Sequence, residues 1–295
     1  MNSDIIKLTH ADTVMIGYDS ATSDTSGNAH IPSSNHVVRP VALRFDNDSG
    51  SGNTDNLYLN ICFGFTINSI PLILLLAIAN GRVRTDDTHT TIEFNWNALM
   101  PDIPVGAISF YNFTLNVMYM PESGDPRRTP FTVIYRKQIY PEAFIRDFIL
   151  TPQTLAMQNV YTRTAAIREP VTSSKTIVCD MNLDITLCKG FHIALPTALT
   201  RLTLTTNDYQ IYDYDEPRLP YVTTPTLVPN LIFFPFNPDS NKTTTSTFRS
   251  DYLQIRLHFA TPVTSAHIFA IAHNNLCVKS GTADIELWRD VPFHA

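Results

Sequence analysis

Histidine and acidic side chains are the groups in this 295-residue chain that would bind a metal ion most readily. His267 and His273 alternate with apolar residues, and in a strand they would share a face but lie about 20 Å apart, too far for one ion to join them. The runs 86–89 (DDTH) and 213–216 (DYDE) offer the oxygen ligands that a divalent cation prefers. Such runs are more typical of solvated turns, so we predict no metal site.

Motifs for nucleophilic or nucleotide chemistry are absent from the sequence. The triplet 48–50 (DSG) matches the aspartic-protease signature in letters, but it follows a polar loop rather than a buried strand end. No serine lies in a GxSxG elbow, and with only 10 glycines there is neither GxxxxGK[ST] nor GxGxxG. Paired carboxylates for glycoside hydrolysis depend on spatial separation, which the sequence does not report. We therefore expect a chain that is not an enzyme, with no catalytic residues and no cofactor.

The four cysteines, Cys62, Cys179, Cys188 and Cys277, are widely spaced and form no CxxC pair. Each lies in an apolar run, where a reduced cysteine behaves as a small hydrophobic residue. We predict free, buried structural thiols in a protein made in a reducing compartment. The longest apolar run, Leu72 to Ala79, is far shorter than the roughly 20 residues that a membrane-spanning helix needs.

The charged residues indicate a surface that is covered by other proteins. There are 21 Lys+Arg and 27 Asp+Glu, a formal net charge of −6, which argues against a protein that coats nucleic acid. Of the basic residues, 15 are Arg and 6 are Lys. Protein interfaces are enriched in Arg and aromatic residues and depleted in Lys, because the flat guanidinium group is less strongly hydrated than an ammonium group. A large β domain with little open surface would show a similar composition.

Short alternating runs of apolar and polar residues predict the fold class. They are 57–67, 90–96, 107–120, 131–136, 176–188, 199–205, 252–260 and 283–288. Turns rich in Pro and Asn separate them without regular helices, which is typical of antiparallel sheets packed as a sandwich. We therefore predict a mainly β protein, with antiparallel β-sandwich-like sheets and a small helical insertion.

Four segments follow along the chain. Residues 1–56 are expected to be an extended, loop-rich N-terminal segment, with the folded core beginning after it in a β-rich half, 57–138. A helical insertion is expected at 139–170, with one helix over 141–150, where Pro fits the first helical position, and a second over 152–163. The second β-rich half is 171–295.

Within that half, residues 209–238 are dense in Pro, Tyr and Phe. Repeated Pro removes ladder donors, so we expect this segment to run extended over a surface, either pinned beneath its own domain or docked on another chain. Together with the basic pairs Arg127–Arg128 and Arg136–Lys137, it supplies our candidate interface residues. These are Arg127, Arg128, Arg136, Tyr209, Tyr212, Tyr214, Phe233, Phe234 and Phe236.

The opening MNSDIIKLTHADTVMIGYD, the segment TPFTVIYRKQIYPEAFIRDF and the Asn-, Thr- and Pro-rich, Lys-poor texture resemble an insect-virus capsid component. Over the whole chain the resemblance is to the large protrusion, or clamp, proteins of cypoviruses, which are turreted double-stranded RNA viruses of the reovirus family. It implies a protein that clamps neighbouring shell subunits on the outer face of the virion and is made in the host cytoplasm. The implied partners are the major capsid shell protein and, as a second candidate, the turret protein, in many copies per particle.

Two other classes remain open. One is a jelly-roll viral coat protein, although such proteins often carry a basic terminal arm for RNA, which this sequence lacks. The other is a β-sandwich carbohydrate-binding module or hydrolase. A binding module should place aromatic residues beside solvent at a concave site, whereas a clamp should place Arg, Tyr and Phe on flat patches. For the clamp we expect no direct contact with nucleic acid and no membrane span.

Overall fold

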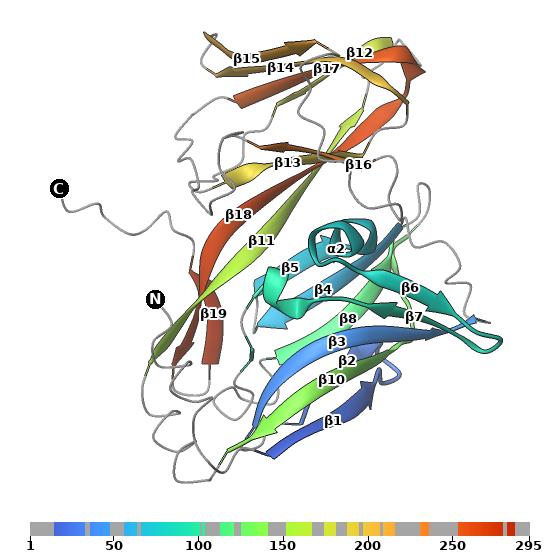
Figure 1. Ribbon diagram of the computed structural model, residues 1–295, viewed down its shortest axis with the longest axis vertical. Helices are drawn as coiled ribbons and strands as arrows, with labels where there is room; N and C mark the ends of the chain where they lie inside the picture. The colour runs from blue at the N-terminus through green and yellow to red at the C-terminus, as the bar shows by residue number, and fades with distance from the viewer. Residues whose placement is uncertain are drawn as a thin grey trace. The chain divides into compact units, whose positions relative to one another are not determined.

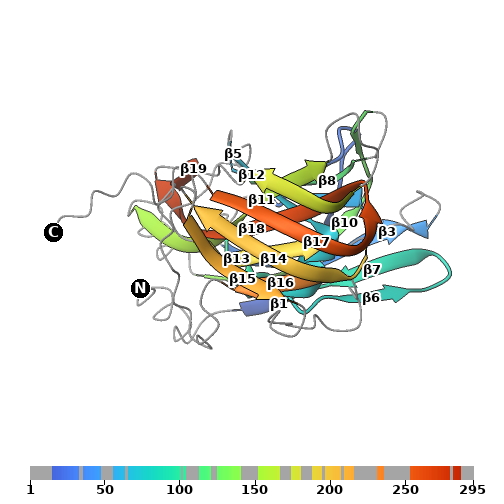
Figure 2. The same ribbon diagram turned by 90° about the horizontal axis from the view of Figure 1, so that it is seen from above.

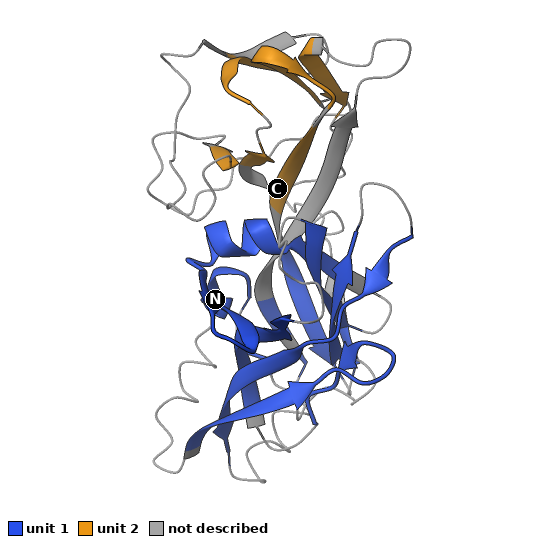
Figure 3. Ribbon diagram, turned by 90° about the vertical axis from the view of Figure 1, so that its right-hand side faces the viewer, with its two compact units in different colours: residues 1–158, 274–287 blue, residues 159–273, 288–295 orange. Residues whose placement is uncertain are grey.

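The computed structural model divides the chain into two compact units, residues 1–158 with 274–287 and residues 159–273 with 288–295 (Figure 3). The structure describes residues 15–32, 36–47, 56–63, 66–100, 102–103, 113–120, 125–140, 152–166, 174–180, 188–194, 197–206, 209–215, 231–235, 253–279 and 282–286. Within these residues the chain is almost entirely antiparallel β-sheet, which confirms the predicted fold class (Figure 1).

The first unit contains two five-stranded sheets. The first sheet has the order β1 (Met15–Thr22), β10 (Thr132–Ile139), β3 (His36–Asp46), β7 (His89–Glu93) and β6 (Arg82–Thr85). The second has the order β2 (Asn28–Ala29), β8 (Phe113–Tyr119), β4 (Leu57–Phe63) and β5 (Thr66–Pro71), with β9 (Arg127–Arg128) pairing β8.

The second set of strands again forms two sheets. One has the order β11 (Gln153–Ala166), β18 (Ser265–Lys279), β13 (Cys188–Ala194) and β16 (Leu231–Pro235), with β19 (Thr282–Glu286) pairing β18. The other has the order β12 (Ser174–Asp180), β17 (Leu253–Val263), β14 (Leu199–Thr206) and β15 (Tyr209–Asp215). Figures 1 and 2 show these two sheets stacked face to face.

Both sets have the same topology. When β6 and β9 are set aside from the first set and β19 from the second, each set has eight principal strands, and in chain order one sheet runs 1-8-3-6 and the other 2-7-4-5. Two sheets of four antiparallel strands connected in this way form a jelly roll. The chain is therefore two consecutive jelly rolls.

Strand alternation places apolar residues between the sheets. In β4 every second residue is buried, from Leu57 to Phe63, and Phe63 stacks on Phe113 of β8 with ring centroids 5.4 Å apart. In the second jelly roll one cluster joins both sheets, with Ile177 and Leu257 from one and Ile193 and Ile268 from the other. Burial of these side chains supplies the main stabilisation of each sandwich.

The apolar run at 72–79 begins as a short helix, α2 (Leu72–Ile78), which buries Leu72, Leu74, Leu75 and Leu76. It follows β5 directly, and a single 3-10 turn, η3 (Trp96–Ala98), follows β7. In the described part of the chain no helix is long and apolar enough to cross a membrane.

Two sequence-based expectations about elements are wrong. The segment 152–163, predicted as a helix, forms most of β11, because its Thr, Val and Tyr side chains suit a strand and sheet pairing outweighs local helix propensity. The core does not begin after residue 56, since Ala29, Val38, Leu43 and Phe45 are buried in the first jelly roll. The predicted helix at 141–150 lies outside the described residues.

The Pro- and aromatic-rich segment 209–238 contributes two strands to the sheets. Strands β15 and β16 each lie at an edge, β15 beside β14 and β16 beside β13. The only proline in either strand is Pro235, the last residue of β16, where an edge strand tolerates a missing N–H donor. Residues 216–230 and 236–238 lie outside the described part of the chain.

Candidate interaction surface

The outer face of the β1–β10–β3–β7–β6 sheet carries the most distinctive set of side chains. Register places Arg44 of β3 opposite Thr91 of β7, and Thr91 opposite Arg84 of β6. In the neighbouring row Ala42 lies opposite Glu93, which lies opposite Arg82. Adjacent strands are about 4.8 Å apart, so these residues form a compact charged patch on one face.

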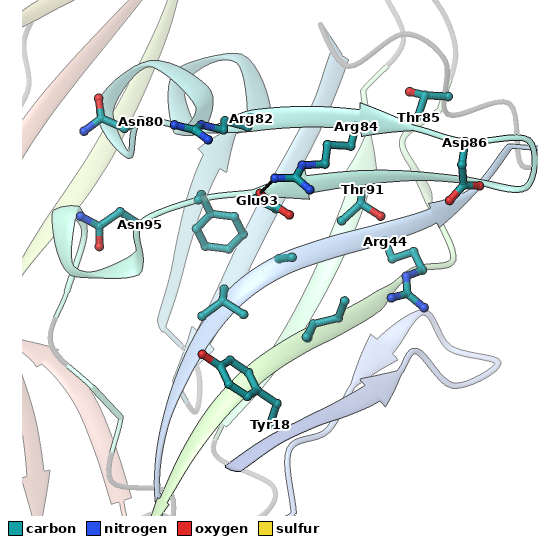
Figure 4. A pocket seen from close by; sticks show the side chains of 14 residues that line it. Tyr18, Arg44, Asn80, Arg82, Arg84, Thr85, Asp86, Thr91, Glu93 and Asn95 are labelled. Atoms are coloured by element: carbon teal, nitrogen blue, oxygen red, sulfur yellow. Dashed lines mark ion pairs between the residues drawn. The ribbon is translucent and has the colours of Figure 1, made fainter. Parts of the chain in front are cut away.

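This patch lines an open groove of about 860 Å³ (Figure 4). Its lining combines Arg44, Arg82, Arg84 and Glu93 with the amides of Asn80 and Asn95, and it includes no lysine. In Figure 4 Arg44 and Arg84 lie on either side of Thr91. The floor between the arginines is thus a small hydroxyl side chain, which leaves space above it.

Of the three arginines that line the groove, one forms an ion pair with an acid in the described structure. Arg84 pairs with Glu93 at 3.4 Å, with the two side chains 67% and 40% exposed. Solvent screens such a pair, so it holds the guanidinium only weakly. Among the described residues neither Arg44 nor Arg82 has a hydrogen-bond or ion-pair partner.

Strand β1 adds apolar side chains to the same face. Ile16 is 59% exposed and Tyr18 is 69% exposed, and Tyr18 lines one side of the groove. Their pairing partners on β10 are Gln138 and Arg136, which point the same way. Large apolar side chains with this much exposure are consistent with contact to another molecule.

Of the residues predicted from sequence, Arg127 and Arg128 form the short strand β9 and are both exposed. Arg127 lies 4.9 Å from the centre of the Tyr119 ring, a cation–π contact. Arg128 is held by its own chain: its Nη1 donates to the backbone oxygen of Ser26 and, at 2.8 Å, to Oδ1 of Asn28.

A row of asparagine amides extends this contact across the second sheet. Asn116 Nδ2 donates to Asn28 Oδ1 at 3.4 Å, and Asn60 Nδ2 donates to Asn116 Oδ1 at 2.8 Å. Asn28, Asn116 and Asn60 are directly paired across β2, β8 and β4. Arg128 therefore ends a hydrogen-bonded row within the molecule, and Arg127 is the residue of the pair that remains available to a partner.

Arg136 lies on β10 opposite Arg39 and Tyr18, at the margin of the charged face. Its Nε is buried without a hydrogen-bond partner among the described residues. Its neighbour Lys137 points to the other side of the strand and donates to Asp19 Oδ2 at 2.7 Å. The basic pair predicted from sequence is thus divided between the two faces.

The predicted aromatic residues fall on β15 and β16. Phe233 of β16 is half-buried and packs against His192, with ring centroids 4.5 Å apart. Tyr209, Tyr212 and Tyr214 belong to the edge strand β15 and Phe234 to β16, but their side chains lie outside the described part of the structure, as does Phe236 entirely. Their role as an interface stays a prediction.

The runs considered as metal ligands have other roles. Asp86 accepts hydrogen bonds from the backbone N–H groups of Thr88 and His89 at 2.8 Å, and these bonds, that of Thr88 first, lower the pKa of its carboxyl group. Asp213 accepts from Arg201 Nε at 2.6 Å. Within the described ranges no group of three or more His, Cys, Asp or Glu side chains is arranged to hold a metal ion.

Three cysteines, Cys62, Cys179 and Cys277, are free thiols, as predicted. Cys179 is buried, as predicted, whereas Cys62 and Cys277 are only half-buried. Burial raises the pKa of the Cys62 thiol, which keeps it protonated and unreactive at neutral pH. The side chain of Cys188 lies outside the described residues.

The chain matches no protein-family model and no curated protein by sequence. Its fold does match solved structures. A chain of the PBCV-1 virus capsid matches with a TM-score of 0.61 at 10% identity, over 94% of this chain and 98% of that one. A chain from Sulfolobus Turreted Icosahedral Virus matches with a TM-score of 0.52 at 9% identity, over 88% and 89% of the two chains.

The major capsid protein of bacteriophage PM2 matches with a TM-score of 0.50 at 7% identity, over 86% of this chain and 97% of that one. These likenesses extend over both jelly rolls rather than over one of them. At such low identities they establish a shared fold. The protein therefore has the fold of viral major capsid proteins.

Proposed function

We propose that this chain is a non-enzymatic structural protein of a viral capsid, present in many copies in the virion. The observation that carries the proposal is the succession of two jelly rolls with the same strand order, matched over 94% of this chain by a capsid chain that is itself covered over 98% of its length. A match of that extent includes both jelly rolls. It therefore supports a capsid role more strongly than a match to a single sandwich domain would.

The composition agrees with a protein that functions by contact with other proteins. A net charge of −6 does not favour nucleic acid as the main partner of the chain. Its basic residues are mostly Arg, which suits contact surfaces better than Lys. Small contacts repeated over many symmetric positions act together, because after the first contact the next is effectively intramolecular.

Between the two capsid roles considered from sequence, we favour a shell-forming jelly-roll coat protein. Full-length likeness to major capsid proteins supports that role, whereas the external clamp is supported only by the sequence resemblance to cypovirus proteins. The clamp, with a shell protein and a turret protein as partners on the outer face of the capsid, remains our second candidate. It is favoured by the segments at 1–19 and 129–148 that carry the resemblance.

Sedimentation velocity of the purified chain, followed by electron microscopy, tests the proposal. A shell-forming subunit should associate with itself into discrete oligomers or particles as its concentration rises. A clamp should remain a monomer alone and bind only to preformed particles of another protein. A chain that remains monomeric at all concentrations and does not bind purified particles would contradict both capsid roles.

A further inference from the structure

The groove on the outer face of the first sheet has a geometry suited to holding negative charge. Arg44 and Arg84 are two strand spacings apart, about 10 Å between backbones, and the short side chain of Thr91 lies between them. Arg82 lies one row further along β6. Two guanidinium groups therefore flank one hydroxyl group on an open face, and a third lies one row away, opposite Glu93.

The lining of the groove carries a net positive charge, because three arginines face two acids, Asp86 and Glu93. Glu93 pairs with Arg84, whereas Asp86 accepts hydrogen bonds from the backbone N–H groups of Thr88 and His89. An Arg side chain presents two parallel N–H donors to a carboxylate or sulfate group, which is a stronger and more directional contact than a lysine makes. The absence of lysine from the lining suits recognition of planar or tetrahedral anions.

We propose that this groove binds an anionic saccharide, with its sulfate or carboxylate groups held between Arg44 and Arg84. An extended polyanion carries charges at intervals and so can reach both arginines at once. Tyr18, which is 69% exposed at the side of the groove, offers a flat surface for a sugar ring. Asn80 and Asn95 offer amide groups for its hydroxyls. This binding activity goes beyond the structural role proposed above and does not depend on it.

The layout favours a saccharide over a folded protein surface as the occupant. The core of a protein interface is apolar and depleted of charge, and polar residues form its rim. The groove differs from such a core, because five of its 14 lining residues are charged and lie beside apolar side chains such as Ala42 and Ile134. A flexible, hydrated polyanion fits a lining with this much charge at a smaller desolvation cost.

Binding of heparin, with neutral dextran as the reference polysaccharide, tests the inference on the purified full-length chain by isothermal titration calorimetry. We expect heparin to bind, dextran not to bind, and heparin affinity to fall as salt rises. Arg44→Ala and Arg84→Ala should each weaken heparin binding about tenfold, as expected for loss of a charge-assisted hydrogen bond. Glu93→Gln should strengthen it, since it removes the acid that competes for Arg84.

Arg256→Ala is the matched control, because Arg256 is an exposed arginine on β17 of the other jelly roll. It should leave heparin affinity unchanged. Heparin binding that survives the double variant R44A/R84A, or that falls equally in Arg256→Ala, would show that general positive charge is responsible and would overturn the proposal. Absence of heparin binding would also overturn it, and loss of self-association in R44A/R84A would then identify the groove as a contact between copies.

Discussion

Arg39 of β3 and Asp102 form a two-pronged ion pair, with Nε donating to Oδ1 at 2.6 Å and Nη2 donating to Oδ2 at 2.9 Å. The side chains are 28% and 13% exposed. Next to them, the backbones of Val38 and Ile103 exchange two hydrogen bonds of 2.8 Å. The ion pair and this bridge together hold residues 102–103 alongside β3 at Val38 and Arg39.

Asp102→Asn should lower the free energy of unfolding by about 1 to 2 kcal/mol, because it removes the charge that two guanidinium donors require. Equilibrium unfolding in urea measures the change. Arg84→Ala, which breaks the exposed pair with Glu93, is the matched control and should leave stability unchanged within error. Equal losses in the two variants would mean that burial and two-pronged geometry do not distinguish these pairs.

Gly27 is required by the turn before β2. Its φ is +73°, and a Cβ placed on it would lie 2.7 Å from Cβ and 2.9 Å from Cδ of Arg128. Gly27→Ala should therefore destabilise the protein by about 2 kcal/mol, through backbone strain and a steric clash. Thermal or urea unfolding measures this loss.

Gly17→Ala is the control for that substitution. The nearest atoms to a Cβ at Gly17 belong to Lys137 and lie 3.6 Å away, an ordinary van der Waals contact. The variant should unfold at the same urea concentration as the natural chain. A loss at Gly17 as large as that at Gly27 would argue against positive φ as the cause.

The alternation in β12 provides a direct test of the sandwich. Ile177 is 2% exposed and belongs to the core cluster, whereas the next residue, Val178, is 44% exposed. Ile177→Ala should cost about 2 to 5 kcal/mol of unfolding free energy, since it leaves a cavity. Val178→Ala should change it by less than about 0.5 kcal/mol. Similar costs at both positions would contradict the assigned register of β12.

This alternation explains why much of the fold could be predicted from the sequence. A strand with one buried face has apolar residues at every second position, and the runs at 131–136 and 252–260 largely coincide with β10 and β17. The run at 57–67, predicted as one strand, contains β4 and the start of β5. Strand order is set by contacts between distant residues, as when β10 pairs with β1 and β3, and no local pattern reports it. The repetition of the jelly roll was missed for this reason.

Local sequence patterns predicted the wrong element where pairing with a distant strand determines the structure. Segment 152–163 contains good helix formers, yet it is part of a 14-residue strand. The groove could not be found from the sequence, since Arg44, Arg82 and Arg84 come from two separate segments that only the register of β3, β7 and β6 brings together. The predicted pair at 127–128 was visible because its members are adjacent in the chain.

His192 of β13 makes the stability of the second jelly roll depend on pH. It is 6% exposed, packs against Phe233, and its Nδ1 has no hydrogen-bond partner in the described structure. Burial lowers its pKa from 6.5 to about 3. The imidazole therefore stays neutral in the folded protein over a pH range in which the unfolded chain takes up a proton.

The sign of the effect follows from this difference in proton uptake. Above pH 6.5 the His192 ring is neutral in both the folded and the unfolded state, so the folded state keeps its full stability. As pH falls from 6.5 towards 3, only the unfolded chain binds the proton, and the free energy of unfolding decreases. At pH 5 the loss from this group should be about 2 kcal/mol. His258, whose pKa is lowered by burial and then by Arg201 and Arg256, acts in the same direction.

His192→Phe separates the contribution of this ring from that of every other titrating group. Phenylalanine keeps a flat ring against Phe233 and cannot be protonated, so the variant should lose less stability than the natural chain between pH 7 and pH 5. Urea unfolding of both proteins at the two pH values measures the difference, and His258 and all the carboxyl groups cancel because both proteins contain them. If both proteins lost the same stability, His192 would have to accept its proton in the folded core, and burial would not be lowering its pKa.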